Sequence, residues 1–215
     1  MVRMDPATGA ITASFVPSQP ERWYADAEAG FGAVWAISNS NEVGRINPDS
    51  DKITLSVTVG SDPTDYNDTI AVGQRYVWVA ISDDRSLVGL DPNSGDEVAR
   101  LDMDGPGVVA AGEAGVWVAL ENGTLFQVDE RKKSIGRSID AGTQGYNLVE
   151  VGTDYVWFVG SDAELRQFAA ATGELVASFP LAGGPEGFLI ADGSAWIEYY
   201  ARGRVERLDL GISTE

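Results

Sequence analysis

The chain has 215 residues with 33 acidic and 15 basic side chains, a formal net charge of −18, and neither histidine nor cysteine. Without those two residue types it cannot form a Ser-His-Asp triad, a cysteine nucleophile, a zinc finger, haem or iron-sulfur ligation, or a disulfide framework. Its acidity argues against nucleic-acid binding, because like charge repels a phosphate backbone, and hydrophobic residues at 44% suffice for a sizeable core.

The N-terminus leads directly into a turn and contains no apolar run typical of a signal peptide. No stretch reaches the length of a transmembrane helix. We therefore expect a soluble protein that does not bind membranes, cytoplasmic as written or exported if a leader has been removed.

The first elements in the chain are a strand that alternates and then turns, and a second short strand. The former is Val2-Arg3-Met4-Asp5-Pro6-Ala7-Thr8-Gly9, and the latter covers Ala10 to Val16. A Pro- and Gln-containing loop follows at 17–24 and carries Trp23 and Tyr24. Proline presets φ and glycine accepts positive φ, so the Asp-Pro-x-x-Gly segment is typical of a turn between two strands.

From this point the chain repeats itself. Val-Trp or Ala-Trp pairs recur at spacings of 43, 39, 40 and 39 residues, at Trp35, Trp78, Trp117, Trp157 and Trp196. About ten residues after each tryptophan comes an alternating strand, as in Val43-Gly44-Arg45-Ile46-Asn47-Pro48 and Leu87-Val88-Gly89-Leu90-Asp91-Pro92. The segment at 2–9 is a sixth copy of this second marker.

Each repeat contains four short strands, exemplified by Thr69 to Val72, Tyr76 to Ile81, Leu87 to Leu90 and Glu97 to Leu101. Period-two alternation and β-branched residues favour strands, and no segment predicts a long helix. Four strands in roughly 40 to 45 residues are typical of a propeller blade. We predict an all-β, five-bladed β-propeller that occupies residues 1–215 as a single domain.

The repeat pattern also bears on how the ring closes. The strand at Ala10 to Val16 is expected to complete the last blade by pairing with Arg204 to Leu210, which would hide two strand edges. Residues 2–5 would then duplicate 205–209. That duplication leaves a second interpretation open, in which the chain is a structural fragment of a larger propeller with six or seven blades.

The repeats resemble those of virginiamycin B lyase, also called streptogramin lyase, and related bacterial propellers. The matching segments are AVWAISNSNEVGRINPDSDKITLSVTVG at 33–60 and YVWVAISDDRSLVGLDPNSGDEVARL at 76–101. The resemblance implies a propeller whose lyase members use a histidine base and a divalent metal on one face. This chain has no histidine, so the resemblance concerns architecture and carries over no base.

A binding face is predicted at the loops that enter the inner strands and those between the second and third strands. The repeated tryptophans are expected to be core between blades, whereas Trp23 lies outside the repeat and is a candidate ligand contact. Tyrosines, amides and carboxylates suit sugars and basic peptides. The predicted ligand-binding residues are Trp23, Tyr24, Asp65, Tyr66, Asn67, Tyr146, Tyr199, Tyr200 and Arg202.

Oxygen ligands on the same face suggest a weaker alternative, a Ca²⁺ or Mg²⁺ site at Asp65, Asn67 and Glu186. The function predicted first is a non-enzymatic recognition or scaffold propeller, with no cofactor and no catalytic residue. It would act as a monomer on a small polar ligand, a carbohydrate or a basic peptide. The alternatives are a metal-assisted lyase or hydrolase, in which carboxylates replace histidine, and a structural fragment.

Overall fold

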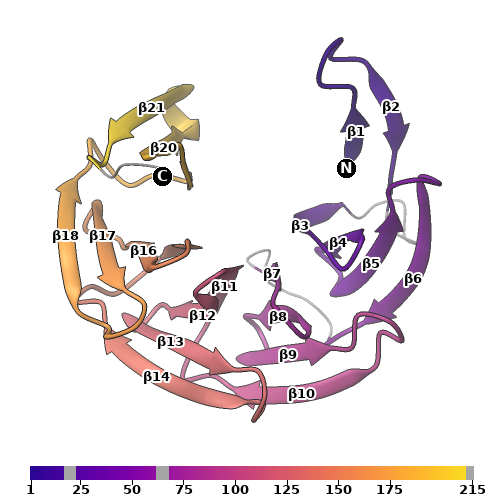
Figure 1. Cartoon of the computed structure of the whole chain (residues 1–215), viewed down its shortest axis with the longest axis horizontal. Coiled ribbons are helices and arrows are strands. Elements are labelled where there is room, and N and C mark those ends of the chain that lie inside the picture. Colours follow the sequence, from indigo (N-terminus) through magenta and orange to yellow (C-terminus); the bar gives the residue numbers. More distant parts are fainter. Residues whose placement is uncertain (17–22, 62–67, 212–215) are drawn as a thin grey trace. The chain divides into compact units, whose positions relative to one another are not determined.

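The fold is an all-β five-bladed propeller with mostly four-stranded blades, as the repeat pattern predicted (Figure 1). The computed structural model describes residues 1–16, 23–61 and 68–211. Within these ranges the only helical segment is the 3-10 turn η1 (Tyr200–Arg202). No helix there has the length and apolar character needed to cross a membrane.

Each blade is an antiparallel sheet of consecutive strands. An N-terminal hairpin of β1 (Val2–Met4) and β2 (Ile11–Ser14) precedes them. Blade 1 contains β3 (Tyr24–Gly30), β4 (Ala33–Ser38), β5 (Glu42–Asn47) and β6 (Lys52–Thr58). Blade 2 contains β7 (Thr69–Val72), β8 (Val77–Ile81), β9 (Ser86–Leu90) and β10 (Glu97–Asp102).

The remaining three blades follow in the same order. Blade 3 contains β11 (Gly107–Gly112), β12 (Gly115–Leu120), β13 (Thr124–Asp129) and β14 (Ser134–Asp140). Blade 4 contains β15 (Leu148–Val151), β16 (Tyr155–Val159), β17 (Glu164–Ala169) and β18 (Leu175–Pro180). Blade 5 has three strands, β19 (Gly187–Ala191), β20 (Ser194–Tyr199) and β21 (Arg204–Asp209).

The chain divides into two compact units. The first is Met1–Val109 with Glu130–Lys133, and it holds the hairpin and blades 1 and 2. The second is Ala110–Asp129 with Ser134–Glu215, and it holds most of blade 3 and blades 4 and 5.

The second strand of a blade is apolar on both sides because another sheet can cover either face. All five residues of β8 are buried, whereas the outer strand β10 alternates between exposed and partly buried positions. In the first unit, Trp35 and Val43 of blade 1 share a buried cluster with Val88 and Leu90 of blade 2. In the second unit, Trp157 of blade 4 shares one with residues of blade 5 that include Tyr199.

Polar contacts reinforce the joints between sheets in the first unit. Arg45 lies over the Trp35 ring at 5.9 Å and donates a hydrogen bond of 2.9 Å to the Pro92 carbonyl oxygen in blade 2. Arg3 of the hairpin repeats this contact on blade 1, donating to the Pro48 carbonyl oxygen at 2.6 Å. The joint between blades 1 and 2 therefore combines an apolar face with an arginine on the next proline turn, and the arginine contact recurs between the hairpin and blade 1.

Glu130 is a buried carboxylate in the turn after β13 that no sequence pattern singled out. Its oxygens accept the indole N–H of Trp78 at 3.0 Å and the backbone N–H groups of residues 74, 75 and 76 at 3.0 to 3.3 Å. Four donors around one anion compensate for its desolvation. Glu130 therefore fixes the lead-in to the β8 tryptophan.

Two details of the sequence prediction are wrong. The segment at 10–16 does not pair with Arg204 to Leu210, because β2 pairs with β1 and the last blade keeps three strands. A hairpin closed by a short turn loses less conformational entropy than a pairing between the two ends of the chain, because the closed loop is much shorter. Trp196 is also not core: it is 42% exposed, whereas Trp35, Trp78, Trp117 and Trp157 are at most 2% exposed.

Candidate functional site

The predicted ligand-binding residues are distributed over both units. Trp23 and Tyr24 belong to the first unit, and Tyr146, Glu186, Tyr199, Tyr200 and Arg202 belong to the second. Asp65, Tyr66 and Asn67 lie outside the described residues. Each group is therefore considered within its own unit.

In the first unit, Trp23 is exposed and Tyr24 is directed into blade 1. The Trp23 side chain is 53% exposed, and its backbone is held by Asn39, whose side-chain oxygen accepts the Trp23 N–H at 3.1 Å. The Tyr24 ring packs over Gly44, where a Cβ would lie 3.0 Å from the tyrosine hydroxyl. Burial, followed by the charge of Glu42, raises the pKa of Tyr24. Tyr24 thus packs against its own blade more than it faces solvent.

In the second unit, Tyr146, Glu186 and Tyr200 form a surface group. The Glu186 carboxylate accepts the backbone N–H of Tyr200 at 2.9 Å and that of Ala201 at 3.4 Å. Partial burial and then the charge of Glu186 raise the pKa of Tyr146. Both tyrosine side chains are exposed, at 49% and 79%, so their rings are available to a ligand.

Tyr199 and Arg202 have structural contacts instead. Tyr199 is 1% exposed and packs in the cluster that joins blades 4 and 5. Arg202 lies 5.5 Å from the centre of the Tyr199 ring and donates to the Ala182 carbonyl oxygen at 3.2 Å. The ring of Tyr199 is directed inward from β20, and its contact with a ligand stays a prediction.

Of the three predicted metal ligands, only Glu186 lies among the described residues. Asp65 and Asn67 lie outside the described residues, and the Glu186 oxygens already accept two backbone N–H groups. In the part of the chain that the structure describes, no group of three acidic side chains comes together in a way that could hold a metal ion.

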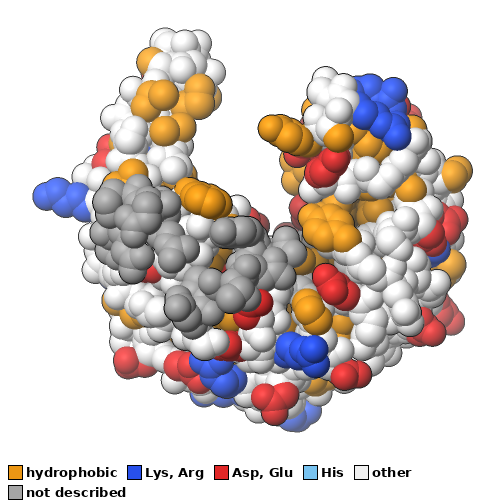
Figure 2. All heavy atoms as spheres, turned by 180° about the vertical axis from the view of Figure 1, so that it is seen from behind, with side chains coloured by type: hydrophobic (Ala, Val, Ile, Leu, Met, Phe, Trp, Pro, Cys, Tyr) orange, Lys and Arg blue, Asp and Glu red, His pale blue; other side chains and the backbone are white. Residues whose placement is uncertain are grey.

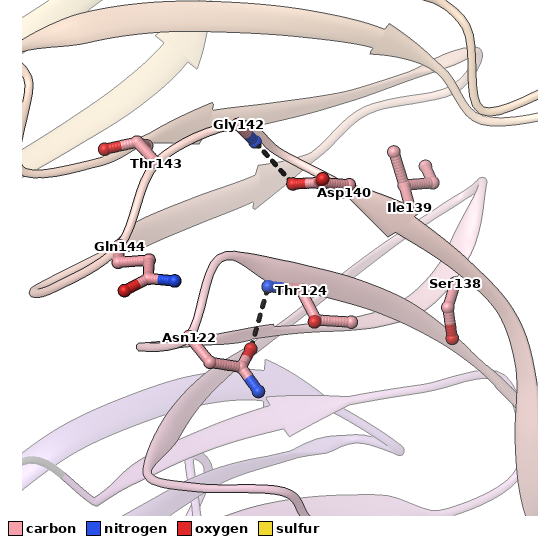
Figure 3. A pocket seen from close by; sticks show the side chains of 8 residues that line it. All are labelled: Asn122, Thr124, Ser138, Ile139, Asp140, Gly142, Thr143 and Gln144. Atoms are coloured by element: carbon pink, nitrogen blue, oxygen red, sulfur yellow. Dashed lines mark hydrogen bonds between the residues drawn. The ribbon is translucent and has the colours of Figure 1, made fainter.

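Blade 3 contains a polar recess of about 520 Å³ that the sequence analysis did not identify. Figure 3 shows its lining, which comes from the β12–β13 turn, the first residue of β13, the end of β14 and the loop that follows. The lining residues are Asn122, Thr124, Ser138, Ile139, Asp140, Gly142, Thr143 and Gln144.

Hydrogen bonds hold the recess in shape. The Asp140 carboxylate accepts the Gly142 N–H at 2.9 Å, and the Asn122 side-chain oxygen accepts the Thr124 N–H at 3.0 Å (Figure 3). The loop at 141–147 is tied to the β12–β13 turn, because Ala141 donates to the Gly123 carbonyl oxygen at 2.8 Å and Gly145 to that of Glu121 at 2.7 Å. The recess is therefore formed before any ligand arrives.

The chemistry of the recess is that of hydroxyls, amides and one carboxylate. Three hydroxyl groups and two side-chain amides supply both donors and acceptors, Asp140 adds the negative charge, and the eight lining residues include no basic group. Such a set can bind a neutral ligand with many hydroxyl groups and disfavours an anion. Asn122 lies in a loop between a second and a third strand, and Gln144 lies in a loop that enters an inner strand. Both loops belong to the predicted binding face, although neither residue was among the predicted ligand-binding residues.

The turn at 160–163 supports the recess loop from blade 4. The Ser161 hydroxyl donates to the Gln144 carbonyl oxygen, and Arg166 pairs with the carboxylates of Asp162 and Glu164. Hydrogen bonding from Arg166 holds the pKa of Asp162 below its usual 3.8.

Because the folded pKa of Asp162 is depressed, its stabilising contribution is present above pH 3.8 and is lost as the pH falls through the lower folded value. The contribution is expected to be at most about 1 kcal/mol, since the carboxylate is partly screened by solvent. Thermal melts between about pH 5 and pH 2 should show a smaller loss of stability in Asp162→Asn than in the parent. Equal acid sensitivity of the two proteins would contradict this role.

Comparisons with known proteins show similarity in fold and assign no family. No family model matches the chain, and no curated protein matches it. Hydrazine synthase from Kuenenia stuttgartiensis is similar in structure with a TM-score of 0.67 and 17% identity, over 94% of this chain and 70% of that one. The WD40 domain of Pan2 from Neurospora crassa matches with a TM-score of 0.69 and 15% identity, over 87% of this chain.

This chain spans 61% of the Pan2 domain. At these identities the likeness shows a β-propeller fold.

Proposed function

We propose that this chain is a non-enzymatic recognition propeller that binds a small neutral carbohydrate in the recess of blade 3. The observation that carries the proposal is the recess itself, a preformed volume of about 520 Å³ in which six of the eight lining residues carry hydroxyl, amide or carboxylate groups. Sugars present closely spaced hydroxyls that both donate and accept hydrogen bonds, as these side chains do.

Charge supports a neutral ligand. The net charge of −18 and the Asp140 carboxylate oppose binding of phosphates and uronates. A basic peptide, the other ligand class expected from the sequence, would find a single carboxylate among the lining residues. Amides and hydroxyls therefore favour the carbohydrate.

Tyr146 gives the recess an aromatic neighbour. It follows the lining residue Gln144 by two positions and is 49% exposed. The loop that carries both residues is fixed by Asn147, whose side-chain amide donates to the Leu120 carbonyl oxygen. An exposed ring on the loop that lines the recess offers apolar area to the C–H face of a sugar.

The experiment is a calorimetric titration of neutral monosaccharides and oligosaccharides, each paired with its uronate, into the purified chain. We expect saturable binding of at least one neutral sugar and weaker binding of its uronate. Thr143→Val removes one hydroxyl at constant shape and should weaken binding by about threefold to tenfold.

Thr153→Val is the matched control, because Thr153 is exposed in a loop of blade 4 and does not line the recess. Its dissociation constant should equal that of the parent. Equal binding of neutral and anionic sugars, or an unchanged affinity in Thr143→Val, would contradict the proposal.

The relationship to streptogramin-lyase-like propellers stays a prediction that rests on the repeat motifs at 33–60 and 76–101. We propose that the chain shares their blade repeat without the lyase reaction, because it has no histidine to serve as the base. Cleavage of a streptogramin by the purified chain, with Ca²⁺ or Mg²⁺ supplied, would contradict this proposal and favour the metal-assisted alternative.

A further inference from the structure

The outward side of blade 5 is an exposed apolar surface, here called the Trp196 face. It consists of Leu189, Trp196, Glu198, Val205 and Arg207, which the strand register places on one side of β19, β20 and β21. The three apolar side chains are 55%, 42% and 63% exposed. The opposite side of the same sheet carries Ile197 and Tyr199, which are buried against blade 4.

Blade 1 shows what covers such a face. Trp35, Val43 and Arg45 have the register positions of Trp196, Val205 and Arg207, because each arginine is paired with its tryptophan across two strands. There the tryptophan and valine are fully buried by Val88 and Leu90 of the next blade. The Trp196 face therefore has the composition of one half of a joint between blades.

The other half of such a joint is exposed on the N-terminal hairpin. Val2 and Met4 precede the Asp-Pro turn of β1 at the positions that Val88 and Leu90 have before the Asp-Pro turn of β9. Val2, Met4 and the paired Ile11 are 47%, 54% and 62% exposed. We call this surface the hairpin face. Figure 2 shows hydrophobic side chains on the surface of both regions.

The arginine and the proline-turn carbonyl that form the polar contact of such a joint are also present on these two surfaces. Arg207 lies 5.6 Å from the Trp196 ring, as Arg45 lies 5.9 Å from the Trp35 ring. Arg45 also reaches the turn carbonyl of Pro92, whereas the hydrogen bond that Arg207 makes, at 3.0 Å, is to Ser194 of its own blade.

The turn that would receive Arg207 is also open. At Gly95, in the turn of blade 2, a Cβ would lie 2.6 Å from Leu55 of blade 1, because the two sheets are packed. At Gly9, in the turn of the hairpin, a Cβ would meet nothing within 4 Å. The hairpin turn thus has an unoccupied side where a neighbouring outer strand fits.

We propose that the Trp196 face binds the hairpin face of a second copy of this chain, with Arg207 donating to the Pro6 carbonyl oxygen. The contact is head-to-tail, since it joins two different surfaces of identical chains. Glu198 lies on the Trp196 face, two residues after Trp196. The equivalent positions in blades 1 and 4 are occupied by Ile37 and Val159, which are buried. A carboxylate there weakens the contact relative to an internal joint, so the association is reversible. This departs from the monomer expected from the sequence.

Cross-linking of single-cysteine variants tests the proposal, because the parent contains no cysteine. Met4→Cys and Val205→Cys are suitable, since their counterparts Leu90 and Val43 lie in one buried cluster. With a short bismaleimide, a mixture of the two variants should give a covalent dimer, and each variant alone should give far less. Both positions are exposed, so folding is preserved, and circular dichroism verifies it.

Sedimentation of the parent should show a mass that rises with concentration. Trp196→Glu should abolish this rise, whereas Leu175→Glu, at a similarly exposed position on β18, should leave it unchanged. A constant monomer mass with no mixed dimer overturns the proposal. An internal cross-link in the monomeric double variant Met4→Cys/Val205→Cys also overturns it, because the hairpin would then bind its own chain.

Discussion

Replacing Trp35 with alanine is expected to lower the free energy of unfolding by about 3 to 5 kcal/mol, and the same replacement of Trp196 by less than about 1 kcal/mol. Both residues occupy the same position in their blades. Trp35 is fully buried in the cluster that joins blades 1 and 2, so truncation leaves a large cavity. Trp196 is 42% exposed, so truncation removes surface that is partly solvated already.

Denaturant titration of both variants, monitored by circular dichroism at low protein concentration, measures the difference. Low concentration matters because self-association would add stability to the parent. Trp157→Ala serves as a second buried case in the other unit and should behave like Trp35→Ala. Similar losses for Trp35→Ala and Trp196→Ala would show that the Trp196 face is covered in the isolated chain.

Replacing Glu130 with alanine is expected to cost about 2 to 4 kcal/mol, because it leaves the Trp78 indole N–H and three backbone N–H groups without their acceptor. Glu130→Gln keeps one acceptor oxygen but brings an NH₂ group toward other donors and removes the charge. Its expected cost is about 1 to 2 kcal/mol.

Glu97→Ala is the control for this experiment. Glu97 also has a charged partner, since it pairs with Arg100 at 2.6 Å, but its side chain is 42% exposed. Surface pairs contribute about 1 kcal/mol or less. Thermal and denaturant unfolding should therefore rank the variants Glu130→Ala, Glu130→Gln and Glu97→Ala in order of decreasing loss. A harmless Glu130→Ala would contradict the assigned role.

The two proposed binding surfaces are separable by experiment. The recess is built from β13, β14 and the adjoining turns of blade 3, whereas the Trp196 face belongs to blade 5. Trp196→Glu should therefore leave sugar affinity unchanged, and Thr143→Val should leave self-association unchanged. Loss of one property without the other distinguishes failure of the proposed function from failure of the further inference.

Local patterns alone predicted the architecture. Alternating apolar residues, the repeated tryptophan pairs and the Asp-Pro turns each depend on neighbouring residues, which is why the strands Thr69–Val72 and Val77–Ile81 were expected almost to the residue. Composition by itself excluded whole classes of chemistry, because those reactions need the histidine or cysteine side chains that this chain lacks.

The candidate site required the tertiary structure. The repeat predicted that the loops of Asn122 and Gln144 share one face, but the recess between them depends on backbone hydrogen bonds that tie the two loops together, which no local pattern encodes. Tyr199 and Tyr200 are adjacent in sequence, yet one is 1% and the other 79% exposed. They differ because Tyr199 faces the buried cluster from the end of β20, whereas Tyr200 begins the turn η1.

The same distinction applies to the tryptophans and to Glu130. The repeat makes Trp35 and Trp196 equivalent, but their burial differs because only the first is covered by a following blade in the described structure. Glu130 resembles any turn carboxylate until its contacts with Trp78 are seen. Strand order and turns follow from short-range sequence, whereas burial and side-chain partners depend on which sheets come together.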